Sequence, residues 1–122
     1  MTENNHEDTR LKDSLKFANY RATLNNQQKK KKTNFEAQSI YSMNGGTFKL
    51  TPLLITYVKT LIDTGFDSAV ILDINDTPIM IDDLEDFSDD INEKYLTLIR
   101  EYYLDYEKIK EARSVEDIIT EW

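Results

Sequence analysis

The chain has 122 residues, of which 39% are hydrophobic, and this suits one small domain or a small domain with an extended arm. It has no cysteine, which excludes disulfides and thiolate metal sites and makes a reducing interior or a virus particle a more natural setting than secretion. We expect no signal peptide and no membrane span, because no apolar run approaches the required length of about 20 residues.

The net charge of −8 is unevenly distributed along the chain. Residues 1–62 carry a net charge of +5, whereas residues 63–122 carry −13. A basic front half and an acidic back half can attract each other within one chain, between copies of the chain, or toward two different partners.

The N-terminal third is expected to be a disordered tail over residues 1–9 followed by a helical arm over residues 10–37. Two apolar stripes of helical spacing support the helix. They are Leu11, Leu15, Ala18 and Ala22, and beside them Phe17, Tyr20 and Leu24. No apolar side chain follows until Phe35, so the second half of this helix is predicted to be solvated or to lean on a partner.

Residues 38–122 are expected to form a compact α+β domain. Asn44-Gly45 predicts a β-hairpin over residues 39–50, because a primed turn needs the positive φ that Asn and Gly tolerate. Thr51-Pro52 then predicts the start of a buried helix that ends at Gly65. A second hairpin is expected to pair residues 69–72 with residues 79–81.

The C-terminal third predicts a long amphipathic helix and a short terminal helix. Asp82 and Glu85 resemble a capping box, which starts the long helix. Its apolar stripe runs with steps of three and four to about Arg113. The stripe contains Leu84, Phe87, Ile91, Tyr95, Leu98, Tyr102, Tyr106 and Ile109. Ser114 and Asp117 predict a new cap before the short terminal helix, so the fold class is α+β and helix-dominated.

An acidic surface is expected where the long helix begins, at Asp82, Asp83, Asp86, Asp89 and Asp90. The macrodipole favours carboxylates in the first turns of a helix, and this alone explains them. A DNA-mimicking or partner-binding surface and a divalent-cation site are the alternatives. The spacing does not match a calcium loop of the EF-hand type, because the required Gly and Glu are missing.

The run Lys29–Lys32 has three interpretations: a solvated face, a contact with an acidic protein surface such as another copy, and phosphate binding on a nucleic acid. No aromatic side chains are interleaved with the lysines for base stacking, which weakens the last interpretation. The residues predicted to bind a partner are Tyr20, Leu24, Lys29, Lys30, Lys31, Lys32, Phe35, Tyr103 and Trp122.

The sequence contains no recognisable catalytic constellation. His6 is the only histidine and falls in the expected tail, and there is no cysteine for nucleophilic catalysis. Gly45-Gly46 lacks the residues that would follow in a phosphate-binding loop. We therefore expect a protein that is not an enzyme and that has no cofactor, no metal and no small-molecule substrate.

Three stretches of the sequence form a recognisable set: residues 41–48 (YSMNGGTF), residues 71–73 with residues 78–87 (ILD and PIMIDDLEDF), and residues 101–115 (EYYLDYEKIKEARSV). Together they resemble small proteins encoded by large contractile-tailed phages of the T-even type that infect marine bacteria. The resemblance covers about residues 35–115. These motifs are structural and name no chemistry. The resemblance implies a phage setting, and therefore the host cytoplasm during infection or the virion.

The leading functional hypothesis is a non-enzymatic phage structural or assembly protein that works by contacting other protein subunits, which could include copies of itself. One alternative is an acidic inhibitor whose C-terminal half occupies a basic, nucleic-acid-binding groove of a host enzyme. A second alternative is an accessory factor that binds nucleic acid through Lys29–Lys32.

Overall fold

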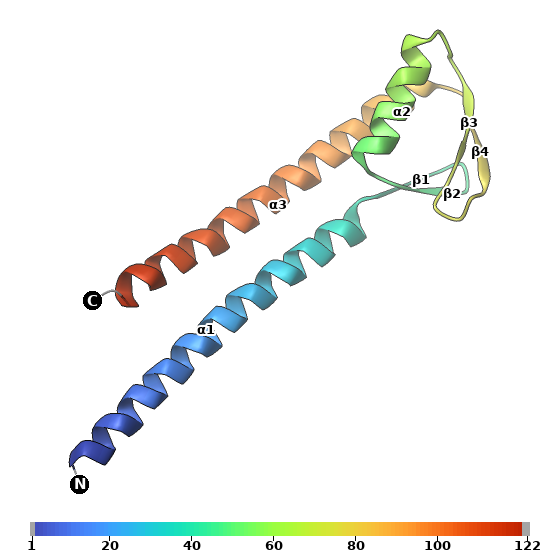
Figure 1. The fold of residues 1–122 in the computed structure, drawn as a ribbon. Coiled ribbons are helices and arrows are strands. Elements are labelled where there is room, and N and C mark those ends of the chain that lie inside the picture. The colour runs from blue at the N-terminus through green and yellow to red at the C-terminus, as the bar shows by residue number, and fades with distance from the viewer. Residues whose placement is uncertain (1, 121–122) are drawn as a thin grey trace. The chain divides into compact units, whose positions relative to one another are not determined.

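The computed structural model describes the backbone of residues 2–120 and the side chains of residues 9–113. Seven elements follow one another along the chain (Figure 1). They are α1 (Thr2–Gln38), β1 (Ile40–Met43), β2 (Gly46–Lys49), α2 (Pro52–Asp63), β3 (Ala69–Leu72), β4 (Pro78–Ile81) and α3 (Leu84–Thr120). The expected α+β, helix-dominated order of long helix, hairpin, helix, hairpin and long helix is confirmed.

The chain divides into two compact units, which are described separately. Unit 1 contains residues 1–33 and 103–122, and unit 2 contains residues 34–102. The helix expected as a separate arm therefore shares its unit with the last part of α3. Residues 2–9, expected as a tail, lie within α1.

The first hairpin of unit 2 turns at Asn44-Gly45, as expected. Asn44 has φ 52° and Gly45 has φ 81°, which is the left-handed backbone that a two-residue primed turn requires. The strands pair antiparallel, with Tyr41 opposite Phe48 and Ser42 opposite Thr47. A side chain at Gly46 would not fit, because its Cβ would lie 2.6 Å from Cγ1 of Ile79 in the second hairpin.

Helix α2 has a defined cap at each end. The Thr51 hydroxyl accepts a hydrogen bond from the Leu54 N–H at 3.2 Å, and Pro52 occupies the first turn, where its missing N–H is not needed. At the other end, Gly65 adopts φ 99°, and the N–H groups of Gly65 and Phe66 donate to the carbonyls of Ile62 and Leu61. This is a Schellman ending, which satisfies carbonyls that the helix would otherwise leave unpaired.

The second hairpin is joined to the first through Asp73 and Thr47. The Asp73 carboxylate accepts three backbone N–H bonds, from Asn75 (2.8 Å), Thr77 (2.9 Å) and Thr47 (3.1 Å). The Thr47 carbonyl in turn accepts the Ile74 N–H at 2.8 Å. The bonds that the Asn75 and Thr77 N–H groups donate to Asp73 shape the turn between β3 and β4. The two bonds made by the backbone of Thr47 attach this turn to β2.

Helix α3 differs from the prediction at both ends. Its capping side chain is Asp83 and not Asp82, since the Asp83 carboxylate accepts the Asp86 N–H at 3.0 Å. At the other end, the expected break before Ser114 is wrong, because α3 continues to Thr120 and no separate terminal helix is present among residues 2–120. Ser114 and Asp117 suit a helix start, but no Gly or Pro lies nearby to stop the preceding helix.

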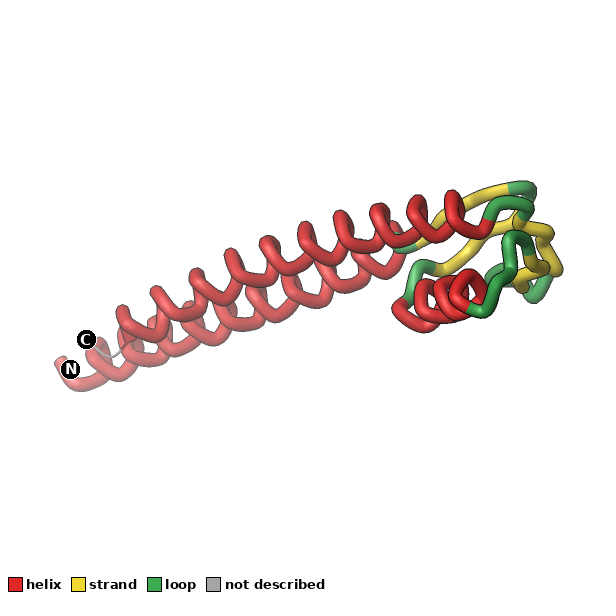
Figure 2. Tube along the Cα trace, turned by 90° about the horizontal axis from the view of Figure 1, so that it is seen from above, coloured by secondary structure: helices red, strands yellow, loops and turns green. Residues whose placement is uncertain are grey.

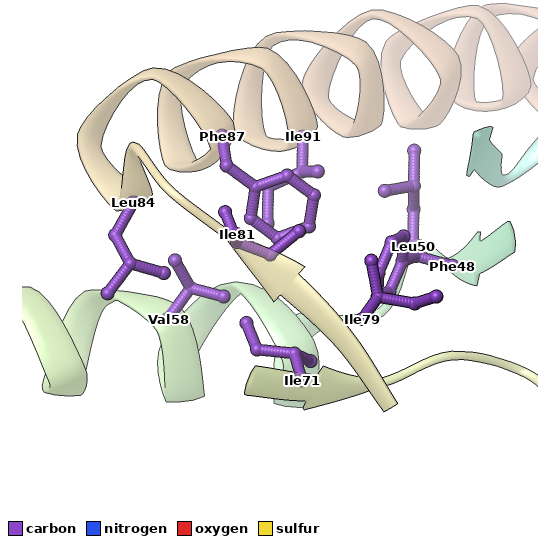
Figure 3. Packing of buried hydrophobic residues seen from close by; sticks show 9 residues of the cluster. All are labelled: Phe48, Leu50, Val58, Ile71, Ile79, Ile81, Leu84, Phe87 and Ile91. Carbon is purple, nitrogen blue, oxygen red and sulfur yellow. The ribbon is translucent and has the colours of Figure 1, made fainter. Parts of the chain in front are cut away.

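The core of unit 2 collects apolar side chains from five elements (Figure 3). It consists of Phe48, Leu50, Val58, Ile71, Ile79, Ile81, Leu84, Phe87 and Ile91. The Phe87 ring lies near its centre, 5.2 Å from the Phe48 ring in an edge-on arrangement and 5.8 Å from the Tyr41 ring. Both hairpins are thereby packed against α2 and the first turns of α3.

The link through Asp73 predicts a specific pH dependence of stability. Its three hydrogen bonds, the one from Thr77 most of all, lower the pKa of Asp73 below its ordinary value of 3.8, although burial acts in the opposite direction. The charged carboxylate therefore stabilises the folded state above its unfolded pKa, and this contribution is lost as the pH falls through the lower folded pKa. We expect Asp73→Asn to be less stable than the natural chain at about pH 7, with the difference shrinking below about pH 4.

Urea unfolding followed between about pH 7 and about pH 3 measures this difference. Asp76→Asn is the matched control, because Asp76 lies in the same turn with an exposed side chain. A stability difference for Asp73→Asn that stays constant over the whole pH range would contradict the assignment.

Candidate protein-interaction surfaces

The surface of unit 2 contains an apolar groove between α2 and β3. Its volume is about 520 Å³, and Phe48 and Ile71 of the core lie in its lining. Leu54, which is half-buried, also lines it, and five further apolar side chains in the lining are between 49% and 81% exposed. They are Leu53 and Tyr57 from α2, Val70 and Leu72 from β3, and Ile74 after β3.

The β3–β4 hairpin exposes apolar side chains because it is apolar on both faces. Ala69, Ile71, Ile79 and Ile81 point toward the core, as strand alternation requires. The opposite face carries Val70 and Leu72, with Met80 and Pro78 across from them. An antiparallel hairpin with one face in water normally has polar residues there. This outward face therefore has the composition of a surface that another molecule covers.

Few charged groups reach the groove. Among the residues that the structure describes, Lys49 and Asp73 are the charged ones in its lining, and the Asp73 carboxylate already accepts three backbone N–H bonds. The Lys49 ammonium group is thus the charge that remains available to a bound molecule. Small-molecule sites generally add several convergent polar groups to an apolar lining, and this groove does not.

In unit 1, α1 and the end of α3 lie side by side (Figure 2) and are held by few buried side chains. Leu24 and Ile109 are the buried hydrophobic residues among the described part of this unit. The Lys31 ammonium lies 3.7 Å from the Asp105 carboxylate, and both side chains are partly exposed. Such a pair contributes about 0–1 kcal/mol to stability, but a charged pair at an interhelical position does select one register.

The structure separates the lysines of the Lys29–Lys32 run. Lys31 lies on the face of α1 that contains Leu24, since the two are seven residues apart, and it pairs with Asp105. Lys30 lies beside it at the edge of the helix pair, in a shallow groove with Lys108. Lys29 and Lys32 are exposed, and Lys29 lies about 140° around the helix from Leu24.

The other residues predicted to bind a partner fall into three groups. Tyr20 and Tyr103 are exposed. Leu24 and Phe35 make contacts inside the chain. Leu24 is a buried residue of unit 1. Phe35 stacks on Tyr102 in unit 2, with the ring centroids 5.1 Å apart. Trp122 lies outside the described residues.

The acidic side chains at the start of α3 are mostly exposed. Asp82, Asp83, Asp86 and Asp89 face solvent. Asp90 is half-buried and accepts a hydrogen bond from the Tyr41 hydroxyl at 2.9 Å, and this bond raises the pKa of Tyr41 above 10.0. Among the described residues, no group of three or more His, Cys, Asp or Glu side chains is arranged to hold a metal ion.

Sequence reasoning did not identify the groove. Thr51-Pro52 to Gly65 is expected to be a buried helix, but Leu53 and Tyr57 within it are exposed. Tyr106 is expected on the apolar stripe of α3 but is exposed, and the neighbouring Asp105 pairs with Lys31 of α1. The sequence does contain one signal for the groove: every residue of β3 is apolar. A strand without polar residues has no face suited to solvent, so one of its two faces exposes apolar side chains.

Comparisons with known proteins do not extend these observations. No family model matches the chain, and no similar protein is found among curated proteins or solved structures. Within the described residues, no helix is both long and apolar enough to cross a membrane.

The assignment of inward and outward faces in unit 1 predicts unequal effects of two leucine substitutions. Leu24→Ala removes a buried side chain and should lower the free energy of unfolding of the helix pair by about 2 kcal/mol. Leu15→Ala changes an exposed residue about 180° around the same helix and should alter it by less than about 0.5 kcal/mol. Thermal unfolding followed by circular dichroism at a helical wavelength measures both, and equal effects would show that the faces are wrongly assigned.

Proposed function

We propose that this protein is a non-enzymatic, phage-encoded structural or assembly protein that acts through contacts with other proteins. The observation that carries the proposal is the apolar groove of unit 2. A domain of this size needs its apolar side chains for its own core, yet five large ones lie exposed around one groove, where they add little to stability and form a patch of the kind that marks interaction sites.

The groove has the composition of the central part of a protein interface. Such centres are apolar, poor in charge and enriched in aromatic residues, with polar groups at the rim. Tyr57 provides a large contact area with a polar end, and Leu53 is the most exposed of the large apolar side chains around the groove, at 81%. Lys49 supplies a charge beside this apolar centre. The phage setting is implied by the sequence resemblance and fits a role that consists of binding rather than chemistry.

Photo-crosslinking from the groove tests the proposed function. A benzophenone amino acid in place of Leu53 should form crosslinks to a partner protein in the cells that naturally produce this chain. The same amino acid in place of Lys59, an exposed residue of α2 outside the groove, should form few. Leu53→Ser should weaken the captured complex by about tenfold or more, because truncating a central interface residue typically costs over 1 kcal/mol.

Mass spectrometry of the crosslinked bands and of purified particles identifies the partner and its place in the virion. Equal crosslinking from positions 53 and 59, or crosslinks to no protein at all, would reject the groove as an interaction surface.

A second candidate function is supported by the exposed acidic side chains Asp82, Asp83, Asp86 and Asp89. A surface of this charge could occupy the nucleic-acid-binding groove of a host enzyme. Binding to such an enzyme should compete with DNA and should weaken strongly as salt is raised from about 0.05 M to about 0.5 M. Affinity that does not change with salt would count against this candidate, and Asp86→Asn with Asp89→Asn provides the matched variant.

A further inference from the structure

The groove of unit 2 runs along one edge of β3, and not along one of its faces. Its lining contains residues 70–74 in unbroken order and, among the described residues, none of β4. One face of a strand presents only every second residue, because successive side chains point to opposite sides. A run of five consecutive lining residues therefore belongs to an edge, and this is the edge of β3 that lies away from β4.

This edge of β3 has no strand paired with it, since the sheet contains only β3 and β4 among residues 2–120. In an antiparallel pair, opposite residues alternately exchange two hydrogen bonds and none. The bonded positions include Asp73, whose N–H donates to the Thr77 carbonyl at 2.9 Å, and therefore also Ile71, two residues earlier. The N–H and carbonyl groups of Val70 and Leu72 thus point away from β4 and toward the groove.

The first hairpin occupies neighbouring edge positions of the second hairpin but leaves this one open. The Ile74 N–H, next along the same edge, donates to the Thr47 carbonyl at 2.8 Å. On the far edge of β4, the Met80 carbonyl accepts a hydrogen bond from the Asn44 side chain at 3.2 Å. Proteins commonly protect a free edge with charged residues or proline, and β3 contains neither. The open edge of β3 is therefore a template for an added strand.

We propose that the groove binds an extended segment of another protein, which pairs with the open edge of β3 as a third strand. The backbone groups of Val70 and Leu72 suit an extended chain, because the N–H and carbonyl groups of a helix are already bonded to each other. The walls of the groove are apolar, so alternate residues of the segment should be apolar as well. Lys49 is placed to pair with one carboxylate of the segment.

A second copy of this chain is a poorer occupant than a segment of another protein. Residues 34–102, which include all of the groove, contain 13 acidic and four basic side chains. Two copies of unit 2 therefore repel each other as they approach. An extended segment with one carboxylate meets far less repulsion.

This inference rests on the proposed function, because it concerns the same groove, and it adds the conformation and chemistry of the bound partner. The two can still fail separately. Crosslinking from Leu53 reports any protein that enters the groove, whereas strand addition also requires the backbone N–H groups of β3 to be bound.

The test measures backbone amide exchange in the full chain by NMR. In the free protein the amides of Val70 and Leu72 should exchange about tenfold or more faster than that of Ile71, which is bonded to β4. The probe is a synthetic peptide with alternating valine and threonine and one glutamate. At saturation it should slow both fast amides by about tenfold or more.

Two backbone changes distinguish strand addition from simple burial of apolar side chains. N-methylation of every second peptide residue removes the N–H groups along one peptide edge. One of the two alternate sets should abolish binding, and the other should leave it nearly unchanged. Leu72→Pro removes an N–H that β4 does not use and should weaken binding by about tenfold or more.

Leu72→Thr is the matched control, because it keeps the N–H and the preference for a strand, and it should weaken binding less than Leu72→Pro. Circular dichroism of both variants checks that they are folded. The methylated peptides test the proposal with the natural chain if Leu72→Pro unfolds.

Four results would overturn the proposal. The first is no binding of the unmodified peptide at about 1 mM. The second is a bound peptide that leaves the amides of Val70 and Leu72 fast, and the third is equal binding of the two methylated peptides. The fourth is self-association of the unliganded chain in sedimentation experiments that Leu72→Pro abolishes, because a second copy would then be the occupant. A partner that still crosslinks from position 53 would preserve the proposed function after any of the first three.

Discussion

The fold of unit 2 depends on the attachment of its two hairpins to each other at Thr47. A two-stranded hairpin is at best marginally stable by itself, and this unit contains two of them in separate sheets. The Thr47 N–H and carbonyl bind Asp73 and Ile74, and the Asn44 side chain adds a hydrogen bond to the Met80 carbonyl at 3.2 Å. These bonds hold the hairpins together so that Phe48, Ile79 and Ile81 can share one core with α2 and α3.

Local signals in the sequence predicted the order of the elements and most of their boundaries, while the contacts between the elements were not predictable. Asn44-Gly45, Thr51-Pro52 and Gly65 each have a backbone preference that acts within a few residues, and each lies where it was expected. The role of Asp73 depends on Thr47, which is 26 residues away along the chain. The spacing of apolar residues in the sequence cannot indicate a hydrogen bond between two such distant residues. The prediction of a separate terminal helix was wrong because capping residues such as Ser114 start a new helix only where the preceding helix has ended, and α3 does not end there.

The surfaces were harder to predict because apolar periodicity does not say which side faces the core. Along β3 every residue is apolar, and it is the burial of Ile71 in the folded chain that shows that Val70 and Leu72 point outward. Along α1 there are two stripes, and the burial of Leu24 together with the pairing of Lys31 with Asp105 shows which of them faces α3. In both cases the sequence contains the stripe, and packing against residues far away in the sequence decides which side is buried.

The positions of polar and apolar groups in this protein are partly the reverse of those that stability alone would favour. Polar side chains occupy two buried positions, where Asp73 organises a turn and the Ser39 hydroxyl donates a hydrogen bond to the Phe35 carbonyl at 2.6 Å. Large apolar side chains such as Leu15, Leu53 and Leu72 occupy outward positions, where the folded chain gains little from them. Inward polar groups specify register, and outward apolar groups gain their free energy only when a partner buries them. Under the proposed function, a partner buries the exposed leucines of the groove, and their free energy is gained in the complex rather than in the folding of the chain.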